Sequence, residues 1–294
     1  MKLEEAIGKI GPLDQAAMEI AQKRWDSIAK PLHSLGKLET LLIQIAGITG
    51  SAEIDLSKRG LVAMCADNGV VEEGVTQTGQ EVTAIVAENF LRYDTSVGVM
   101  CRQNHAEIFP VDMGMVTDTK VRTDHKVAYG TKNMTKGPAM TREQAVKGIE
   151  AGIAMVEELK EKGYRILATG EMGIGNTTTS SAVASVLLKQ SVESMTGRGA
   201  GLTSEGLVRK IAAIRKAIEV NQPDPEDAVD VLAKVGGLDI AGMTGVFLGG
   251  AVYHIPVVMD GFISCVAALI AMEICPAAGD YIIASHVSKE PAAH

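Results

Sequence analysis

Residues 170–180, GEMGIGNTTTS, combine groups that can hold a phosphorylated ligand. The glycines let the backbone bend and approach a ligand without Cβ clashes. Asn176, Thr177 and Thr178 follow at the start of a predicted helix, where their side chains and backbone N–H groups can face an anion. Glu171 does not fit a phosphate contact, because a carboxylate repels a phosphate. We therefore expect Glu171 to face a cationic or proton-donating part of the ligand.

This run is not specific by itself, since glycine-rich turns also serve packing alone. It lacks the Gly-Lys-Ser/Thr of a Walker A loop and the GxGxxG of a dinucleotide site. A second flexible run, TGRGAG at 196–201, carries one arginine, and Lys210 follows on the next predicted helix. A helical lysine is more often only solvated, but a cation here would complete the neutralisation of a phosphate monoester. Together the two runs and Lys210 favour a phosphate site.

Short apolar runs alternate with amphipathic stretches beyond residue 58. Strands are predicted over 61–66, 107–110, 165–168, 257–259 and 282–284, and helices over 81–91, 142–162, 177–188, 204–220, 225–235, 262–274 and the first part of 240–259. Strands separated by helices favour an α/β fold, a parallel sheet with helices on both faces. Helical periodicity over 3–9, 13–29 and 37–48 predicts a small helical unit over residues 1–57, ahead of the α/β domain over 58–294.

Polar residues follow each predicted strand, and in parallel sheets ligands bind at the carboxyl ends of the strands. The exits are 67–69 (DNG), 112–114 (DMG), 170–171 (GE), 260–261 (DG) and 285–286 (SH). Asp and Asn are also common turn residues, so a single exit says little, but five together predict one pocket. Gln80 precedes a predicted helix, where it either caps the helix or pairs with a ring nitrogen.

Composition narrows the classes of function. The 294 residues are 46% hydrophobic and 3% aromatic, so the chain can bury a core, and aliphatic and Met side chains are expected to line a ligand site. The net charge of −8 argues against nucleic-acid or anionic-membrane partners. The N-terminus lacks a signal-peptide pattern, and glycines and Pro256 interrupt the apolar stretch 240–259. We expect a cytoplasmic enzyme that binds small molecules, with no metal and no cofactor, since His and Cys show no ligand spacing.

Six blocks of the sequence together resemble one enzyme family, nicotinate-nucleotide:dimethylbenzimidazole phosphoribosyltransferase of the cobamide lower-ligand pathway. They are ADNGV with GQEVT (66–70, 79–83), GEMGIGNTTTSSA (170–182), TGRGAG (196–201), GGLDIAGMTG (236–245), MDGF (259–262) and SHVSKEP (285–291). The blocks occur in family order and span nearly the whole chain. The resemblance implies a Rossmann-like parallel sheet with a small helical domain, in a homodimer or in a heterodimer with a homologous subunit.

The resemblance also implies a reaction: transfer of the phosphoribosyl group of nicotinate mononucleotide to an aromatic base, with inversion at C1′. The products are an α-ribotide and free nicotinate. Such an enzyme must hold the phosphate, align the base with C1′ and remove a proton from the base. The base itself stays open between 5,6-dimethylbenzimidazole, a purine and a phenol.

Matching positions give the residues that the resemblance implies. Glu171 is an active-site carboxylate and our candidate catalytic residue, and Gln80 lies at the edge of the base pocket. The nucleotide phosphate and ribose are expected at Gly173, Gly175, Asn176, Thr177, Thr178 and Lys210. Met172, Gly199, Asp260 and Ser288 are further candidates for binding substrate.

The sequence departs from the family pattern in two places. His33, in KPLHSLGKLE at 30–39, replaces the glycine of the family's KPPGSLGRLE, which affects an interface or a pocket edge. Family members continue beyond SHxSxEP to an RLGEGTGA motif that carries the proposed general base, whereas this sequence ends at His294. We expect that glutamate beyond residue 294. Alternatively, the chain is one subunit of a two-subunit relative, or Glu171 acts as the base alone. A nicotinamide-dependent oxidoreductase is disfavoured, because no GxGxxG with a ribose-binding acid is present.

Overall fold

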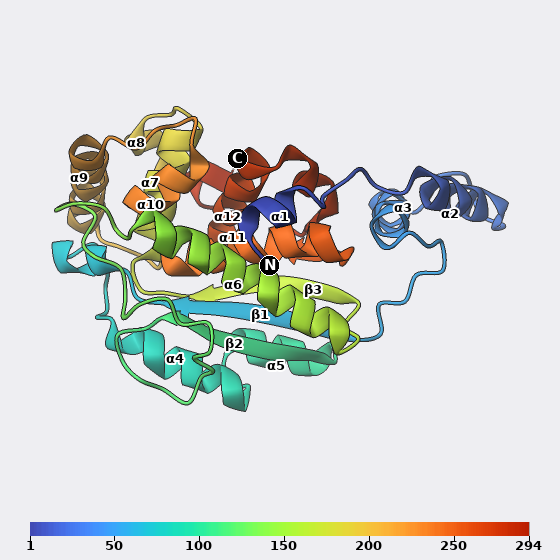
Figure 1. The fold of residues 1–294 in the computed structure, drawn as a ribbon, viewed down its shortest axis with the longest axis horizontal. Coiled ribbons are helices and arrows are strands. Elements are labelled where there is room, and N and C mark those ends of the chain that lie inside the picture. Colours follow the sequence, from blue (N-terminus) through green and yellow to red (C-terminus); the bar gives the residue numbers. More distant parts are fainter. Residues whose placement is uncertain (294) are drawn as a thin grey trace.

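A five-stranded parallel sheet forms the centre of the protein in the computed structural model, which describes residues 1–293 (Figure 1). The strands are β1 (Arg59–Ala66), β2 (Ala106–Gly114), β3 (Ile166–Met172), β4 (Val257–Met259) and β5 (Ile282–Ala284). Their order is β2-β1-β3-β4-β5, and each neighbouring pair is parallel. Helices cover both faces of the sheet. The predicted Rossmann-like α/β fold is confirmed.

Strands β4 and β5 begin and end at the predicted residues, whereas β2 and β3 run further than predicted. They continue because their pairing with β1 continues: Asp112 lies opposite Cys65, and Glu171 lies opposite Met64. Acidic residues are disfavoured in strands, so propensity alone ends both strands too early. Glu171 therefore lies on the last part of a strand and not in the glycine turn.

Most of the helices occur where periodicity predicts them. They are α1 (Leu3–Ile7), α2 (Gln15–Ser27), α3 (Lys37–Thr49), α4 (Glu81–Arg92), α5 (Ser96–Gln103), α6 (Arg142–Glu161), α7 (Asn176–Leu187), α8 (Val192–Met195), α9 (Ser204–Asn221), α10 (Ala228–Val235), α11 (Leu238–Tyr253) and α12 (Phe262–Ile274), with 3₁₀ turns η1 (Gly69–Glu73), η2 (Pro276–Tyr281) and η3 (Pro291–Ala293). Helices α5 and α8 are absent from the prediction, because both are too short to show a period. Thr95 caps α5 by accepting a hydrogen bond from the Gly98 N–H (3.0 Å).

The two helical layers differ in character. Helices α6, α11 and α12 lie on one face of the sheet, and α4 and α5 pack against β1 and β2 on the other (Figure 1). Helix α11 is buried along almost its whole length between the sheet and α6. The two helices approach closely through glycines, since a Cβ on Gly152 would lie only 2.8 Å from the Gly245 Cα. The core thus holds α11 rigidly, and with it the N-terminus of α11 at the edge of the site.

The N-terminal helices fall into two groups. Helix α1 lies on the body of the protein, where the Leu3 N–H donates to Glu150 Oε1 on α6 (3.1 Å). Helices α2 and α3 stand to one side and are joined to the body by extended chain (Figure 1). Gln44 on α3 still reaches the body, since its Nε2 donates to the carbonyl oxygen of Asp280 (2.9 Å). The domain division between residues 57 and 58 stays a prediction.

The backbone conformation at His33 shows how the fold accommodates one departure from the family motif. The φ of His33 is +58°, in the left-handed region that favours glycine. The histidine thus keeps the backbone conformation that a glycine would adopt, at a cost of about 1 kcal/mol.

In the described residues, no helix is long and apolar enough to cross a membrane.

Candidate active site

The candidate site lies at the switch point of the sheet, between β1 and β3. From β1 the chain passes through α4 and α5 on one face to β2, and it returns through α6 on the other face to β3. Loops after neighbouring strands diverge at such a point and leave a crevice, which is where open α/β sheets bind ligands. The run 170–176 and the segment that begins at Asp67 are the two loops that meet there.

The glycine turn after β3 is shaped by protein atoms as much as by any ligand. Gly175 is the N-cap of α7 and has φ +95°, which a residue with a side chain rarely adopts. A Cβ on Gly173 would collide with Asp239 Oδ2 and would lie 2.6 Å from the carbonyl oxygen of Ala66. Both glycines are therefore required by the turn itself, before any nucleotide binds.

Replacing Gly173 by alanine should destabilise the protein by about 1–3 kcal/mol, because a methyl group in a filled site forces its neighbours to move. Urea unfolding followed by circular dichroism measures the change. Gly137→Ala is the matched control, since a Cβ there meets no atom within 4 Å and its effect should stay within about 0.5 kcal/mol. Equal stability of the two variants would contradict the collision at Gly173.

A cavity of about 140 Å³ opens beside this turn. It is lined by residues 75–78, 173–177, Arg198, Ala200 and Leu202. The N-terminus of α7 faces it, and the partial positive charge of a helix N-terminus favours an anion. Thr178 Oγ1, in the first turn of that helix, is buried and has no hydrogen-bond partner among the described residues. The cavity is large enough for a phosphate group and offers it donors.

Two cations lie at this site: Arg198 lines the cavity, and Lys210 on α9 lies buried behind Thr177. The Lys210 side chain is fully buried, and its Nζ donates to Thr177 Oγ1 (2.9 Å) and to the carbonyl oxygen of Gly197 (3.2 Å). Within residues 1–293 no carboxylate lies within ion-pair distance of it. Burial lowers the pKa of Lys210 to about 8, and the nearby Glu290 opposes this only in part. A buried ammonium group without a counter-charge is costly, so Lys210 is suited to hold an anionic ligand.

Acidic side chains gather on the other side of the same run. A second cavity of about 280 Å³ lies there. Its lining includes Gly170, Glu171, Asp260 and Ser285 and the apolar residues Leu61, Ala63, Phe90, Val97, Met100 and Val258. Burial, with the neighbouring carboxylate of Asp239 and then that of Asp260, raises the pKa of Glu171 to about 8. Residues 170–177 therefore separate an anion-binding hollow from an acidic one.

The acidic side chains of two predicted strand exits, Asp67 and Asp112, serve the fold and not the pocket, so the expectation that the acids of all the exits line one pocket is wrong. Asp67 Oδ2 accepts from the Val116 N–H, and Asp112 Oδ1 accepts from the Met115 N–H (both 2.8 Å). Asp112 also pairs with Lys126 (3.1 Å). These carboxylates fasten the segment after β2, which is the ordinary role of Asp in turns.

The remaining predicted residues, Gln80, Met172, Gly199 and Ser288, are not among the residues that line the two cavities. Gln80 does not cap α4 with its side chain; its Nε2 donates to the carbonyl oxygen of Asn68 (3.3 Å). Ser288 is half-buried, and its hydroxyl accepts from the Glu290 N–H (3.3 Å).

Two of the predicted binding residues, Gly199 and Met172, are held in place by contacts within the protein. The Gly199 N–H donates to Glu290 Oε1 (3.0 Å), and the side chain of Met172 packs against the apolar cluster under α4. The roles of all these residues in binding substrate stay predictions.

Sequence reasoning included Asn68 in the first strand exit but missed Asp239 as a site residue. Asp239 is fully buried at the start of α11, and Asn68 donates from Nδ2 to its Oδ2 (3.3 Å). The available signal was a single acid in the apolar run LDIAGM, because a lone charge on a buried helix needs a partner.

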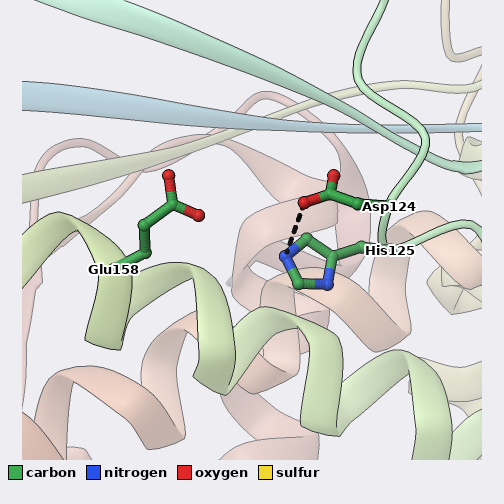
Figure 2. A group of neighbouring side chains, drawn as sticks. All are labelled: Asp124, His125 and Glu158. Carbon is green, nitrogen blue, oxygen red and sulfur yellow. Dashed lines mark ion pairs between the residues drawn. The ribbon is translucent and has the colours of Figure 1, made fainter.

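One group of possible metal ligands lies elsewhere. Asp124, His125 and Glu158 face one another beside α6, as Figure 2 shows. Arg122 neutralises both carboxylates: it contacts Asp124 through Nε (2.8 Å) and Glu158 through Nη2 (2.9 Å). Arg122, with Lys162, lowers the pKa of Glu158 to about 2. We interpret the group as an ion-pair network that fastens the loop to α6.

The fold and the site define an α/β protein with a cavity at a helix N-terminus and a buried lysine at the switch point of a parallel sheet. Comparison with known proteins agrees, since residues 10–294 match the family described as phosphoribosyltransferase. The chain belongs to the nicotinate-nucleotide–dimethylbenzimidazole phosphoribosyltransferase family.

Relatives carry that name over nearly the whole chain. The enzyme of Ruminiclostridium cellulolyticum is 53% identical over 99% of this chain and 83% of its own length, and that of Clostridium tetani is 48% identical over 98% and 80%. Among solved structures, CobT from Thermus thermophilus superimposes with a TM-score of 0.89 at 34% identity, over 95% of this chain and 84% of that one.

Proposed function

We propose that this protein transfers the phosphoribosyl group of nicotinate mononucleotide to 5,6-dimethylbenzimidazole or a similar aromatic base, in the biosynthesis of cobamides. The observation that carries the proposal is the buried Lys210 beside the N-terminus of α7, in a protein of this family. These groups form a site for a phosphate monoester.

The reaction divides between the two cavities. The phosphate occupies the hollow beside Gly173–Thr177, where α7 and Lys210 neutralise it. The ribose then extends toward Glu171, so that the bond between C1′ and the nicotinate nitrogen lies near the acidic side chains. That nitrogen is positively charged in the nucleotide. When the bond breaks, its electron pair neutralises the leaving nicotinate ring, while the unprotonated ring nitrogen of the incoming base bonds to C1′ and the other ring nitrogen gives its proton to a basic group at the site.

Glu171 complements the positive charge that passes from the ring nitrogen to C1′ as this bond breaks. Gln80, held by Asn68, offers an amide to the edge of the incoming base. The apolar walls of the acidic cavity, which include Phe90 and Met100, exclude water from the reacting centre.

Calorimetry with nicotinate mononucleotide, followed by measurement of nicotinate release in the presence of dimethylbenzimidazole, tests the proposal. Saturable binding and release that depends on the added base are expected. Absence of nucleotide binding would overturn the proposal. Trials with adenine and with phenol show which class of base is accepted.

We further propose a homodimer. Apolar side chains are exposed on and between α2 and α3, namely Ile20, Ile28, Leu32, Leu35 and Leu38, and exposed apolar patches of this kind are typical of interfaces. Sedimentation equilibrium that finds a monomer at micromolar concentration would contradict this. The cytoplasmic location stays a prediction from the sequence, which cell fractionation tests.

A further inference from the structure

A second buried carboxylate lies behind the glycine turn. Asp239 has no exposed surface, and its Oδ1 accepts from the Ile240 N–H (2.9 Å) at the N-terminus of α11. Its Oδ2 accepts from Asn68 Nδ2 (3.3 Å) and fills the space that a side chain at Gly173 would need. Asp239 is therefore fixed in place by two elements, the loop that precedes η1 and α11.

Asn176 connects this carboxylate to Glu171. Its Nδ2 donates to Glu171 Oε2, and the same amide lies near enough to Asp239 to lower the pKa of that carboxyl. Asp260, beyond β4, also raises the pKa of Glu171. Glu171 in turn raises the pKa of the buried Cys65 thiol on β1. Among these neighbours no cation faces Glu171, because Lys210 lies on the phosphate side of the turn.

Glu171 and Asp239 are neighbouring, desolvated carboxyl groups with no facing cation, so both cannot be ionised at low cost. Asp239 accepts hydrogen bonds from a backbone N–H and from Asn68, which favour its charged form. Glu171 has only the Asn176 amide as a hydrogen-bond donor, and both desolvation and the Asp239 charge disfavour its ionised form, so of the two carboxyl groups Glu171 is the one that keeps its proton. The pKa values agree in direction: burial raises that of Asp239 to about 6 and that of Glu171 further, to about 8.

We propose that Asp239, fixed by Asn68 and by the Ile240 N–H, is a positioning residue that keeps Glu171 protonated in the empty site, and that the positively charged ring nitrogen of the nucleotide displaces this proton on binding. The inference rests on the proposed function, because it takes the positive ring nitrogen as the charge that replaces the proton. The empty site thereby avoids an uncompensated buried charge, and the occupied site gains a carboxylate beside the reacting bond.

Calorimetry of nicotinate mononucleotide binding at pH 7, in buffers of different ionisation enthalpy, counts the protons released. The wild type should release about 0.8–1 proton more than Glu171→Gln, since a carboxyl with a pKa of about 8 is largely protonated at pH 7. Small exchanges by Lys210 and by the phosphate itself occur in both proteins and cancel in this difference. Asp239→Asn should lower the release by at least about half, because loss of the neighbouring charge lets Glu171 ionise before the nucleotide arrives.

The controls separate this inference from the proposed function. The exposed Asp280, replaced by asparagine, should leave the release unchanged. Asp239→Asn should fold, because the introduced amide can donate to Asn68 Oδ1, which is buried without a partner in the described residues. If it does not fold, ¹³C NMR titration of wild-type Glu171, assigned with Glu171→Gln, serves instead, with a midpoint above pH 7 expected.

The outcomes are distinct. Loss of all nucleotide binding by the wild type would overturn the proposed function. Binding without a difference in proton release between wild type and Glu171→Gln, full release by Asp239→Asn, or an NMR midpoint below pH 6 would overturn only this inference.

Discussion

Replacing Glu171 by glutamine should lower the rate of nicotinate release about 10²–10⁴-fold, the range typical for loss of a positioned carboxyl group, while the protein stays folded. Glutamine keeps an acceptor for the Asn176 amide. It cannot become negative, so the positive charge that moves to C1′ loses its complement. Steady-state kinetics with saturating nucleotide and base measures the effect on kcat. Glu219→Gln, on an exposed face of α9, is the matched control and should be neutral. Unchanged activity of Glu171→Gln would remove Glu171 from the mechanism.

The same variant should change how stability depends on pH. The folded-state pKa of Glu171 is raised from 4.5 to about 8, so the wild type loses stability as pH rises from the unfolded value through the folded one. Glutamine does not titrate and escapes this loss. The free energy of unfolding of Glu171→Gln at pH 9 should therefore exceed that of the wild type by on the order of 1–3 kcal/mol, and the excess should vanish at pH 4.

Replacing Lys210 by methionine should weaken nucleotide binding about 10–150-fold, the equivalent of the roughly 1.5–3 kcal/mol carried by a hydrogen bond to a charged group. The protein should not be destabilised, because an apolar side chain of similar length replaces a buried ammonium group that has no carboxylate within ion-pair distance among the described residues. Isothermal titration with nicotinate mononucleotide measures the affinity, and thermal unfolding measures the stability.

Lys216→Met is the matched control for this change, since Lys216 is exposed on the same helix. In the Glu171→Gln background, the affinity should also fall above about pH 8, where Lys210 loses its proton in the empty site. That dependence should be absent when Lys210 is methionine as well. Equal affinities of Lys210→Met and wild type would place the phosphate elsewhere.

The glycine turn shows how far residue types can carry a prediction. Residues 170–180 point to a strand, a turn and a helix start, and the structure has β3, Gly173–Gly175 and α7 there. Periodicity also finds both ends of β4 and of β5, because short apolar runs between turn residues leave little choice. The longer ends of β2 and β3 depend on hydrogen bonds to β1, which local preference does not contain.

The strand exits show where local reading fails. Asp67, Asp112 and Glu171 look alike in sequence, each an acid after or at the end of an apolar strand. The first two accept backbone N–H groups of the segment after β2, and only Glu171 faces a cavity. The partner of Asp67 is distant in sequence and that of Asp112 is local, so the residue type and its place after a strand do not show which acid is available to a ligand.

The sequence by itself determined the α/β class, the strand, glycine turn and helix over residues 166–187, and the family, because each rests on patterns within a few neighbouring residues or on blocks that can be matched in order. Only the tertiary structure decided the electrostatics. It placed Lys210 against Thr177 and brought Asp239 from α11 behind Gly173 and next to Glu171. The charge of a buried group depends on its desolvation and on its neighbours in space, and neither is written in the order of residues along the chain.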